Sequence, residues 1–187
     1  MLIKFCGIQS VKELNADIIK RTDYFGVIFS PLSKRRITDF AMLIKIKNLI
    51  PKQKLVFVFK GNPIVEIEDL IKKYNPLMIQ VYEEDIQAYF EKRITILRAY
   101  NLISENSLSQ INQNHKLIIL EGKSSGKAEP IAFDLQRIPF PYILAGGINE
   151  SNIKSFTHLN NCIGFDMASG IEEQGITNSK KMLNILA

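Results

Sequence analysis

The sequence predicts an α/β fold, which we interpret as a compact (β/α)8 TIM barrel forming a single domain over residues 1–187. Short apolar segments alternate with amphipathic segments along the whole chain, and no linker or low-complexity segment interrupts them. Strict alternation of this kind predicts parallel strands joined by right-handed crossovers. A closed barrel usually needs roughly 200 or more residues, so the helices and loops of this chain must be short.

Eight runs rich in β-branched and apolar residues are typical of strands buried in a parallel sheet. They are Leu2–Phe5, Tyr24–Ile28, Lys54–Phe59, Leu77–Gln80, Thr95–Ala99, Lys116–Leu120, Tyr142–Ala145 and Ile163–Asp166. Eight units in 187 residues leave about 23 residues for each strand and its helix, which is enough when the helix is short. The number of strands does not by itself distinguish a closed barrel from an open doubly wound sheet.

Amphipathic stretches between the strands predict helices. They include Ser10–Arg21, Thr38–Leu49, Ile64–Tyr74 and Asn149–His158. The side chains of Ser10, Thr38 and Asn149 suit an N-cap, so we expect three of the helices to begin there. The segment Asn101–His115 is polar and rich in Asn, Gln and Ser, and this composition predicts a poorly formed fifth helix.

The composition is that of an ordinary globular protein, with 46% hydrophobic and 23% charged residues. No apolar run approaches the ~18 residues of a membrane span. The chain enters a strand pattern at once, without an export signal, so we expect a cytoplasmic protein with no membrane partner. Cys6 and Cys162 are too few for a disulfide framework, and together with His115 and His158 they form no metal-ligand spacing.

The chain is basic, with a formal charge of +5 and a pI near 9.1. Such a charge is typical of proteins that bind nucleic acid, a membrane surface or an anionic small molecule. The lysines are scattered and no nucleic-acid motif is present, so we expect no nucleic-acid partner. The first strand is followed by Cys6-Gly7-Ile8-Gln9 rather than a glycine-rich fingerprint, which disfavours a nucleotide-binding fold.

Reactive and polar residues fall at the ends of the predicted strands, where the active sites of parallel α/β proteins lie. Cys6 ends the first strand, Gln80 the fourth and Asp166 the eighth. Arg35 lies in the loop after the second strand, and Glu121 follows the sixth. A lone cysteine at a strand end is more often a small core residue, and a charged loop is usually only solvated. The joint placement favours a site, because a barrel would bring all five residues to one rim.

Small residues follow the last two strands, with Gly146 and Gly147 after the seventh and Ser169 and Gly170 after the eighth. A Gly-Gly pair after a strand most often serves a tight turn. In barrels, however, these two loops commonly hold a phosphate with backbone N–H groups and the N-terminus of a short helix. The residues alone therefore predict a barrel enzyme that acts on a phosphorylated anionic substrate.

A set of motifs runs in order from residue 2 to about residue 182. The opening Lys4-Phe5-Cys6-Gly7-Ile8 is the first of these motifs. The others are Gly26–Arg35, Val56–Phe59, Ile79–Val81, Ile143–Asn149 and Gly164–Glu172. In content and spacing this set resembles the phosphoribosylanthranilate isomerases of tryptophan biosynthesis. The opening motif and the last two are specific as a set.

The resemblance implies an Amadori rearrangement on a barrel, catalysed by an aldose–ketose isomerase without cofactor or metal. It implies that Cys6 is the base, a role that requires surroundings able to lower the pKa of its thiol. It also places the general acid at Glu121, and lets the planar guanidinium of Arg35 pair with the anthranilate carboxylate. The remaining implied contacts are Gln80 and Asp166 for the substrate, and Gly146, Gly147, Ser169 and Gly170 for its phosphate.

Three departures from the family pattern concern the catalytic loops. Glu121 stands where the family has an Asp, so its carboxyl lies one methylene further out, and a misplacement of ~1 Å can cost ~10²-fold in rate. Tyr82 and Glu83 replace a His and a Gly after the fourth strand. The glycine-rich loop of the family becomes Lys123–Lys127, followed by Phe133-Asp134-Leu135, and is one residue shorter than expected.

Two further functions remain open at this point. One is a drifted barrel that binds a phosphorylated anionic ligand with weak or no turnover, which Glu121 and the lost His favour. The other is a different sugar-phosphate isomerase or epimerase, since such barrels share the phosphate site. Cys6, Arg35 and the two phosphate motifs favour the active isomerase, with a phosphorylated small molecule as its partner and a monomer or homodimer as its assembly.

Overall fold

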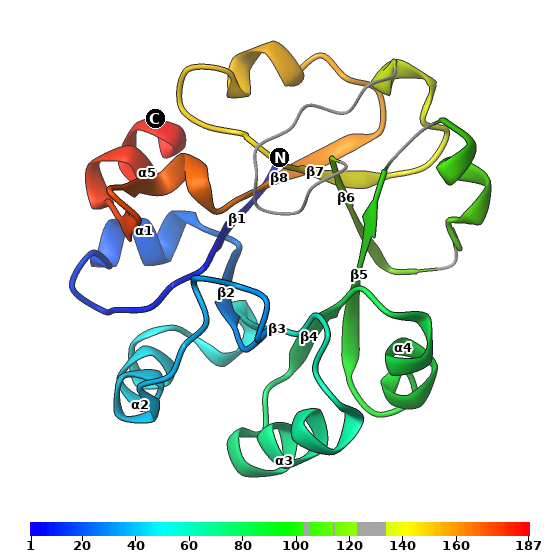
Figure 1. The fold of residues 1–187 in the computed structure, drawn as a ribbon. Helices are drawn as coiled ribbons and strands as arrows, with labels where there is room; N and C mark the ends of the chain where they lie inside the picture. The colour runs from blue at the N-terminus through cyan, green and yellow to red at the C-terminus, as the bar shows by residue number, and fades with distance from the viewer. Residues whose placement is uncertain (103–104, 114, 123–133) are drawn as a thin grey trace.

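Eight parallel strands close into a barrel in the computed structural model, and their order around the barrel follows the chain (Figure 1). The structure describes residues 1–102, 105–113, 115–122 and 134–187. The barrel strands are β1 (Leu2–Cys6), β2 (Tyr24–Ile28), β3 (Leu55–Val58), β4 (Met78–Val81), β5 (Thr95–Asn101), β6 (Leu117–Glu121), β7 (Tyr142–Ala145) and β8 (Cys162–Met167). The closed barrel and all eight predicted strands are therefore confirmed, and the open doubly wound sheet is excluded.

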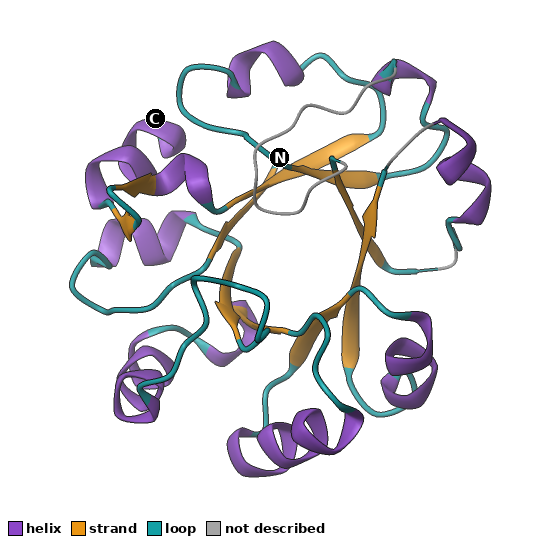
Figure 2. Ribbon diagram, viewed as in Figure 1, coloured by secondary structure: helices purple, strands orange, loops and turns teal. Residues whose placement is uncertain are grey.

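Short helices surround the barrel (Figure 2). In the described part of the chain the α-helices are α1 (Ala16–Arg21), α2 (Phe40–Leu49), α3 (Ile64–Tyr74), α4 (Glu84–Phe90) and α5 (Ser179–Leu186). The longest of them, α3, has 11 residues and the bounds that the sequence predicts. Helices of this length explain how 187 residues suffice for a closed barrel. No helix in the described ranges has the length and apolar character needed to cross a membrane.

The predicted starts of α1 and α2 are wrong. Asn15 rather than Ser10 caps α1, and it accepts a hydrogen bond at 2.9 Å from the N–H of the third helical residue. Asp39 rather than Thr38 caps α2, and its carboxylate accepts from the second and third helical residues at 2.9 and 3.0 Å. An ionised cap also interacts favourably with the helix dipole, which explains why Asp39 prevails over the adjacent threonine. The Ser10 hydroxyl instead accepts from an N–H two residues later.

The helix predicted over Asn149–His158 is a single 3-10 turn at Ile153–Phe156. The side-chain amides of Asn149 and Asn152 both donate to the carbonyl of Gly147, at 3.1 and 2.9 Å. These asparagines stabilise the loop after β7, and local side-chain bonds of this kind compete with helix formation.

The weak fifth helix predicted over Asn101–His115 is also mostly absent. Asn101 is the last residue of β5, and a 3-10 helix occupies Glu105–Gln110. Residues 103–104 and 114 of the predicted segment lie outside the described residues. The polar composition therefore predicted the weakness of the element correctly but not its 3-10 geometry.

The hydrophobic core has two layers, one on each face of the barrel strands. Alternate residues of each strand face the barrel interior, where Val56, Ile119 and Ile143 pack together. The residues between them, such as Phe5 and Phe57, face outward and pack under the helices. Two-sided burial explains the continuous apolar runs in the sequence. The few polar residues on the inner face are therefore the ones that require a functional explanation.

A short hairpin follows β8 and was not predicted. Its strands are β9 (Glu172–Glu173) and β10 (Ile176–Thr177), which pair antiparallel. Gln174 and Gly175 both have positive φ, 50° and 81°, as a type I′ turn between two strands requires. The hairpin leads into α5, which packs beside α1 and closes the outer ring (Figure 1).

Candidate active site

The C-terminal ends of the strands surround a cavity of about 660 Å³. Eight of the predicted site residues line it, namely Cys6, Arg35, Gln80, Glu121, Gly146, Gly147, Asp166 and Ser169. Gly170, the remaining one, lines an adjoining cavity of about 320 Å³ together with Gly147 and Ser169. The structure therefore brings the predicted residues together at one end of the barrel. Among the described residues, no group of three His, Cys, Asp or Glu side chains is placed to hold a metal ion.

A buried ion pair lies beside Cys6 inside the barrel. Lys4 precedes Cys6 by two residues and so shares its inward face, and the Lys4 side chain is fully buried. Its Nζ donates to both carboxylate oxygens of Asp166, at 2.9 Å each. Gly26 on the neighbouring strand provides the space, because a Cβ there would lie 2.6 Å from the Cys6 Sγ and 3.1 Å from the Lys4 Nζ.

The ionisation of Cys6 reflects a competition between burial and charge. Burial raises the pKa of the thiol to about 11, while the Lys4 ammonium acts to lower it and the Asp166 carboxylate to raise it. For Lys4, burial acts to lower the pKa, but Asp166 and Cys6 together raise it above its usual value, so Lys4 stays cationic. A cationic neighbour able to lower the pKa of the thiol is present, but the effect of burial on this pKa is larger.

Lys4 carries a structural role that sequence reasoning missed. In the sequence, Lys4 stands out only as part of the opening motif. A signal was available, since a lysine in an otherwise apolar strand, two residues before a cysteine, lies on the same face as that cysteine. Its partner Asp166 is 162 residues away, and only the closure of β1 against β8 brings the two together.

Arg35 is held by a second carboxylate, Glu172 of the hairpin after β8. The Arg35 Nε and Nη2 donate to the two carboxylate oxygens, with the Nη2 bond at 2.8 Å, and both side chains are 7% exposed. The hydrogen bond to Glu172 raises the pKa of Arg35 further, although burial opposes it. Gly7, with φ of 85°, lets the arginine lie across the end of β1, because a Cβ there would be 2.6 Å from its Cδ. Sequence reasoning assigned Glu172 no role.

The carboxyl of Glu121 lies in a polar chain that crosses from β4 to β6. Its Oε2 accepts a hydrogen bond from the Tyr82 hydroxyl at 3.2 Å, and that hydroxyl accepts from the Gln80 side-chain amide at 3.1 Å. Tyr82 is the residue that replaces the His of the family motif. The buried Gln80 Oε1 has no hydrogen-bond partner among the described residues, so it is available to a hydroxyl or N–H group of a ligand. Residues 123–133, the shortened loop behind Glu121, lie outside the described residues.

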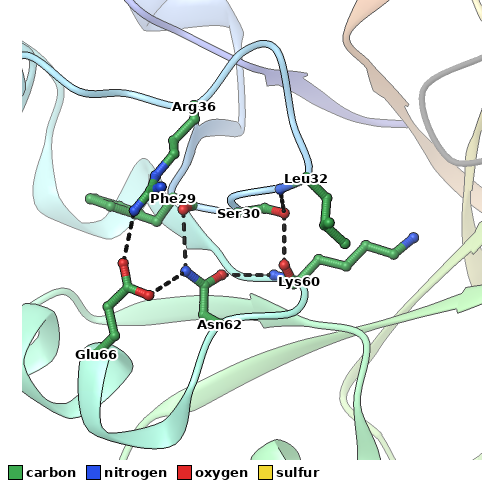
Figure 3. Close-up of polar contacts among 7 residues, drawn as sticks. All are labelled: Phe29, Ser30, Leu32, Arg36, Lys60, Asn62 and Glu66. Atoms are coloured by element: carbon green, nitrogen blue, oxygen red, sulfur yellow. Dashed lines mark hydrogen bonds and ion pairs between the residues drawn. The ribbon is translucent and has the colours of Figure 1, made fainter.

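The loops after β2 and β3 are joined by a network of side-chain hydrogen bonds (Figure 3). The Ser30 hydroxyl donates to the Lys60 carbonyl at 2.7 Å, and the Lys60 N–H donates to the Asn62 Oδ1 at 3.1 Å. Asn62 also donates to Glu66 at 3.1 Å, and Glu66 accepts from Arg36 at 3.0 Å. These bonds fix the loop that carries Arg35 against the loop that begins with Lys60.

The loops after β7 and β8 form the second half of the site. Gly146 and Gly147 have φ of 94° and 70°, conformations that L side chains rarely adopt. Ser169 and Gly170 lie in a three-residue 3-10 turn after β8. A Cβ on Gly170 would lie 1.9 Å from the carbonyl oxygen of Ile148, so only glycine allows the two loops to approach this closely.

Substituting Gly170 with alanine is expected to weaken binding of inorganic phosphate by about tenfold or more, because the new Cβ displaces the Ile148 carbonyl and separates the two loops. Titration calorimetry with phosphate measures the loss. Gly175→Ala is the control: it replaces another glycine of the segment after β8, but its Cβ meets no atom within 4 Å. Equal phosphate affinity in Gly170→Ala and the wild type would place the anion elsewhere.

Comparison with known proteins agrees with this geometry. The family model described as N-(5'-phosphoribosyl)anthranilate isomerase matches residues 3–187. An enzyme of that name from Oceanobacillus iheyensis is 31% identical, and the alignment covers 97% of this chain and 93% of the relative.

Solved structures share the fold. Phosphoribosyl anthranilate isomerase from Thermotoga maritima superposes with a TM-score of 0.81 at 21% identity, covering 100% of this chain and 97% of that one. Another such isomerase, solved in complex with reduced 1-(o-carboxyphenylamino)-1-deoxyribulose 5-phosphate, has a TM-score of 0.78 at 21% identity, covering 100% and 96%. Because the family model spans nearly the whole sequence, this chain belongs to the N-(5'-phosphoribosyl)anthranilate isomerase family.

Proposed function

We propose that this chain catalyses the Amadori rearrangement of N-(5-phosphoribosyl)anthranilate to 1-(2-carboxyphenylamino)-1-deoxyribulose 5-phosphate, a step of tryptophan biosynthesis. The observation that carries the proposal is the placement of Cys6 and Glu121 in one cavity whose rim includes Arg35 and the glycine loops. A thiol and a carboxyl supply a base and an acid, and cationic and backbone donors suit a ligand that is anionic at both ends.

The two ends of the substrate fix its position in this proposal. The backbone N–H groups near Gly146, Gly147, Ser169 and Gly170 bind the phosphate. Arg35 binds the anthranilate carboxylate. Glu172 occupies one edge of the guanidinium through Nε and Nη2, which leaves Nη1 and the second Nη2 hydrogen for the substrate.

Catalysis then proceeds in two proton transfers. Glu121 protonates the ribose ring oxygen, the C–O bond to the anomeric carbon breaks, and the nitrogen lone pair forms an iminium. The Cys6 thiolate takes the proton from C2, giving an enolamine that tautomerises to the ketone. The iminium charge develops in the cavity that holds Cys6, and a neighbouring cation favours the thiolate over the thiol. The high pKa of Cys6 in the substrate-free cavity is therefore compatible with its role as base.

Gln80 and Asp166 complete the proposed substrate contacts. The Gln80 amide oxygen is the unpaired acceptor described above, and it suits a ribose hydroxyl. Asp166 lines the cavity, and its carboxylate keeps acceptor capacity beyond the two bonds from Lys4. We further propose a cytoplasmic enzyme that works as a monomer or homodimer and requires no nucleic-acid or membrane partner.

The alternative function is a drifted barrel that binds the same kind of ligand with weak or no turnover. The replacement of Asp by Glu121 and of His by Tyr82 favours it. A fluorescence assay that follows the loss of phosphoribosylanthranilate separates the two functions. We expect turnover by the wild-type chain, whereas tight binding of the reduced product without turnover would support the drifted barrel.

A further inference from the structure

Lys60 is a cation that the fold holds in a defined place at the mouth of the barrel. It lies two residues after the end of β3, is half-buried, and lines the main cavity. Its backbone is fixed on both sides by the bonds from Ser30 and to Asn62, and Figure 3 shows its side chain extending away from those two residues. Its Nζ lies 4.2 Å from the centre of the Tyr82 ring.

The charge of Lys60 is held in no direct ion pair within the described residues, unlike the charges of the two buried cations of the site, Lys4 and Arg35. Lys4 is neutralised by Asp166 and Arg35 by Glu172, both through direct ion pairs. No carboxylate oxygen of the described residues lies within 4.0 Å of the Lys60 Nζ, so Glu121 and Glu83 act on its charge only from a greater distance, and its neighbour is the aromatic ring. A cation–π contact leaves the ammonium hydrogens facing away from the ring free to donate to an anion.

The position of Lys60 in the barrel indicates which anionic group of the proposed substrate lies near its ammonium. In a closed barrel of eight strands in sequential order, β3 and β7 are four strands apart and therefore lie on opposite sides of the mouth. The glycine loop after β7 is the proposed phosphate site, so a substrate bound there extends toward β2 and β3. The far end of the proposed substrate carries the aromatic carboxylate.

We propose that Lys60 is a specificity-determining residue that binds the aromatic carboxylate of the substrate jointly with Arg35. Arg35 orients the carboxylate through its planar edge, but its charge is already paired with Glu172. Lys60 supplies a positive charge that no direct ion pair in the described part of the chain neutralises and that attracts an anion to this side of the cavity. The inference rests on the proposed function, because it assumes a ligand with a phosphate at one end and a carboxylate at the other.

Titration calorimetry with two stable ligands tests the proposal. The first is the reduced product, 1-(o-carboxyphenylamino)-1-deoxyribitol 5-phosphate, and the second is the same compound without the carboxyl group. Lys60→Met is expected to weaken binding of the first ligand by about tenfold or more, the scale of a lost charge-assisted hydrogen bond, and to leave the second within about twofold. Lys60→Arg is expected to restore most of the loss, which shows that the charge rather than the fold was affected.

Lys73→Met is the matched control, because Lys73 also places its ammonium over aromatic rings, those of Phe40 and Tyr74, but at an exposed position of α3. It is expected to change neither affinity. Equal losses for both ligands in Lys60→Met, or no loss for either, would overturn the role of Lys60.

Steady-state kinetics of Lys60→Met provides a second readout: KM for phosphoribosylanthranilate is expected to rise, while kcat changes by less than about twofold. A fall in kcat with unchanged KM also overturns the proposal, whereas failure of the proposed function itself appears as absent turnover in the wild type.

Discussion

Cys6→Ser is expected to lower kcat by about 10²- to 10⁴-fold while binding of the reduced product changes little. A serine hydroxyl is similar in size to a thiol but is a far weaker base near neutral pH, so it fills the space beside Gly26 without accepting the C2 proton. The measurement is kcat from the fluorescence assay together with the Kd of the reduced product. Retention of more than about a tenth of the wild-type rate would move the base to another residue.

Cys162→Ser is the control for this substitution. Cys162 is the other free, buried cysteine, and it lies at the start of β8, at the opposite end of the barrel from the cavity. Its replacement is expected to leave kcat unchanged, whatever its effect on stability. A comparable loss of kcat in both variants would indicate general damage to the barrel rather than removal of a base.

The pH dependence of the wild type follows from the same thiol. Burial raises the pKa of Cys6 to about 11, and a thiol is protonated below its pKa. The thiolate fraction of the free enzyme therefore increases about tenfold per pH unit through the neutral range, and kcat/KM is expected to rise with pH accordingly. The rate of Cys6 alkylation by iodoacetamide, measured in the Cys162→Ser background, should rise in parallel. An alkylation rate that is constant from pH 6 to 9 would mean that substrate-free Cys6 is already ionised.

The strands and the end of the barrel where the site lies could be predicted because both depend on local sequence. A buried parallel strand needs a continuous apolar run, and its last residue marks the rim of the barrel. Cys6, Gln80 and Glu121 could be found in this way from their positions at or next to strand ends. Helix starts were less predictable, because neighbouring residues such as Thr38 and Asp39 compete for the same cap.

The charge pairing inside the site could not be predicted from the sequence. Lys4 and Asp166 are 162 residues apart, and Arg35 and Glu172 are 137 apart. The first pair depends on the closure of β1 against β8, and the second pair depends on the hairpin that follows β8. The sequence therefore indicates which residues line the cavity, whereas the fold determines which of their charges are already neutralised. Arg35 and Lys60 both line the cavity, but the charge of Arg35 is paired with Glu172, whereas the ammonium of Lys60 contacts an aromatic ring.

Glu121→Gln is expected to lose most of kcat, by about 10²-fold or more, because an amide keeps the shape of the carboxyl but has no acidic proton to give to the ribose ring oxygen. Glu121→Asp is expected to be impaired as well, although it restores the residue typical of the family. The longer side chain of Glu121 places its Oε2 3.2 Å from the Tyr82 hydroxyl, and Tyr82 is itself longer than the His it replaces. An aspartate would withdraw the carboxyl by one methylene and lose this contact.

We interpret the two substitutions of the family pattern as compensating each other through this hydrogen bond, and variants that separate them test the interpretation. Tyr82→Phe removes the hydroxyl that donates to Glu121 but keeps the ring, so we expect a smaller loss of kcat than in Glu121→Gln. Adding Tyr82→Phe to Glu121→Asp should cost little more, because the contact is already broken. Full activity in Glu121→Gln would exclude Glu121 as the acid and leave Asp134 or Asp166 as candidates. Higher activity in Glu121→Asp than in the wild type would instead show a drifted enzyme. In that case the longer side chain of Glu121 lowers kcat, and the aspartate typical of the family restores it.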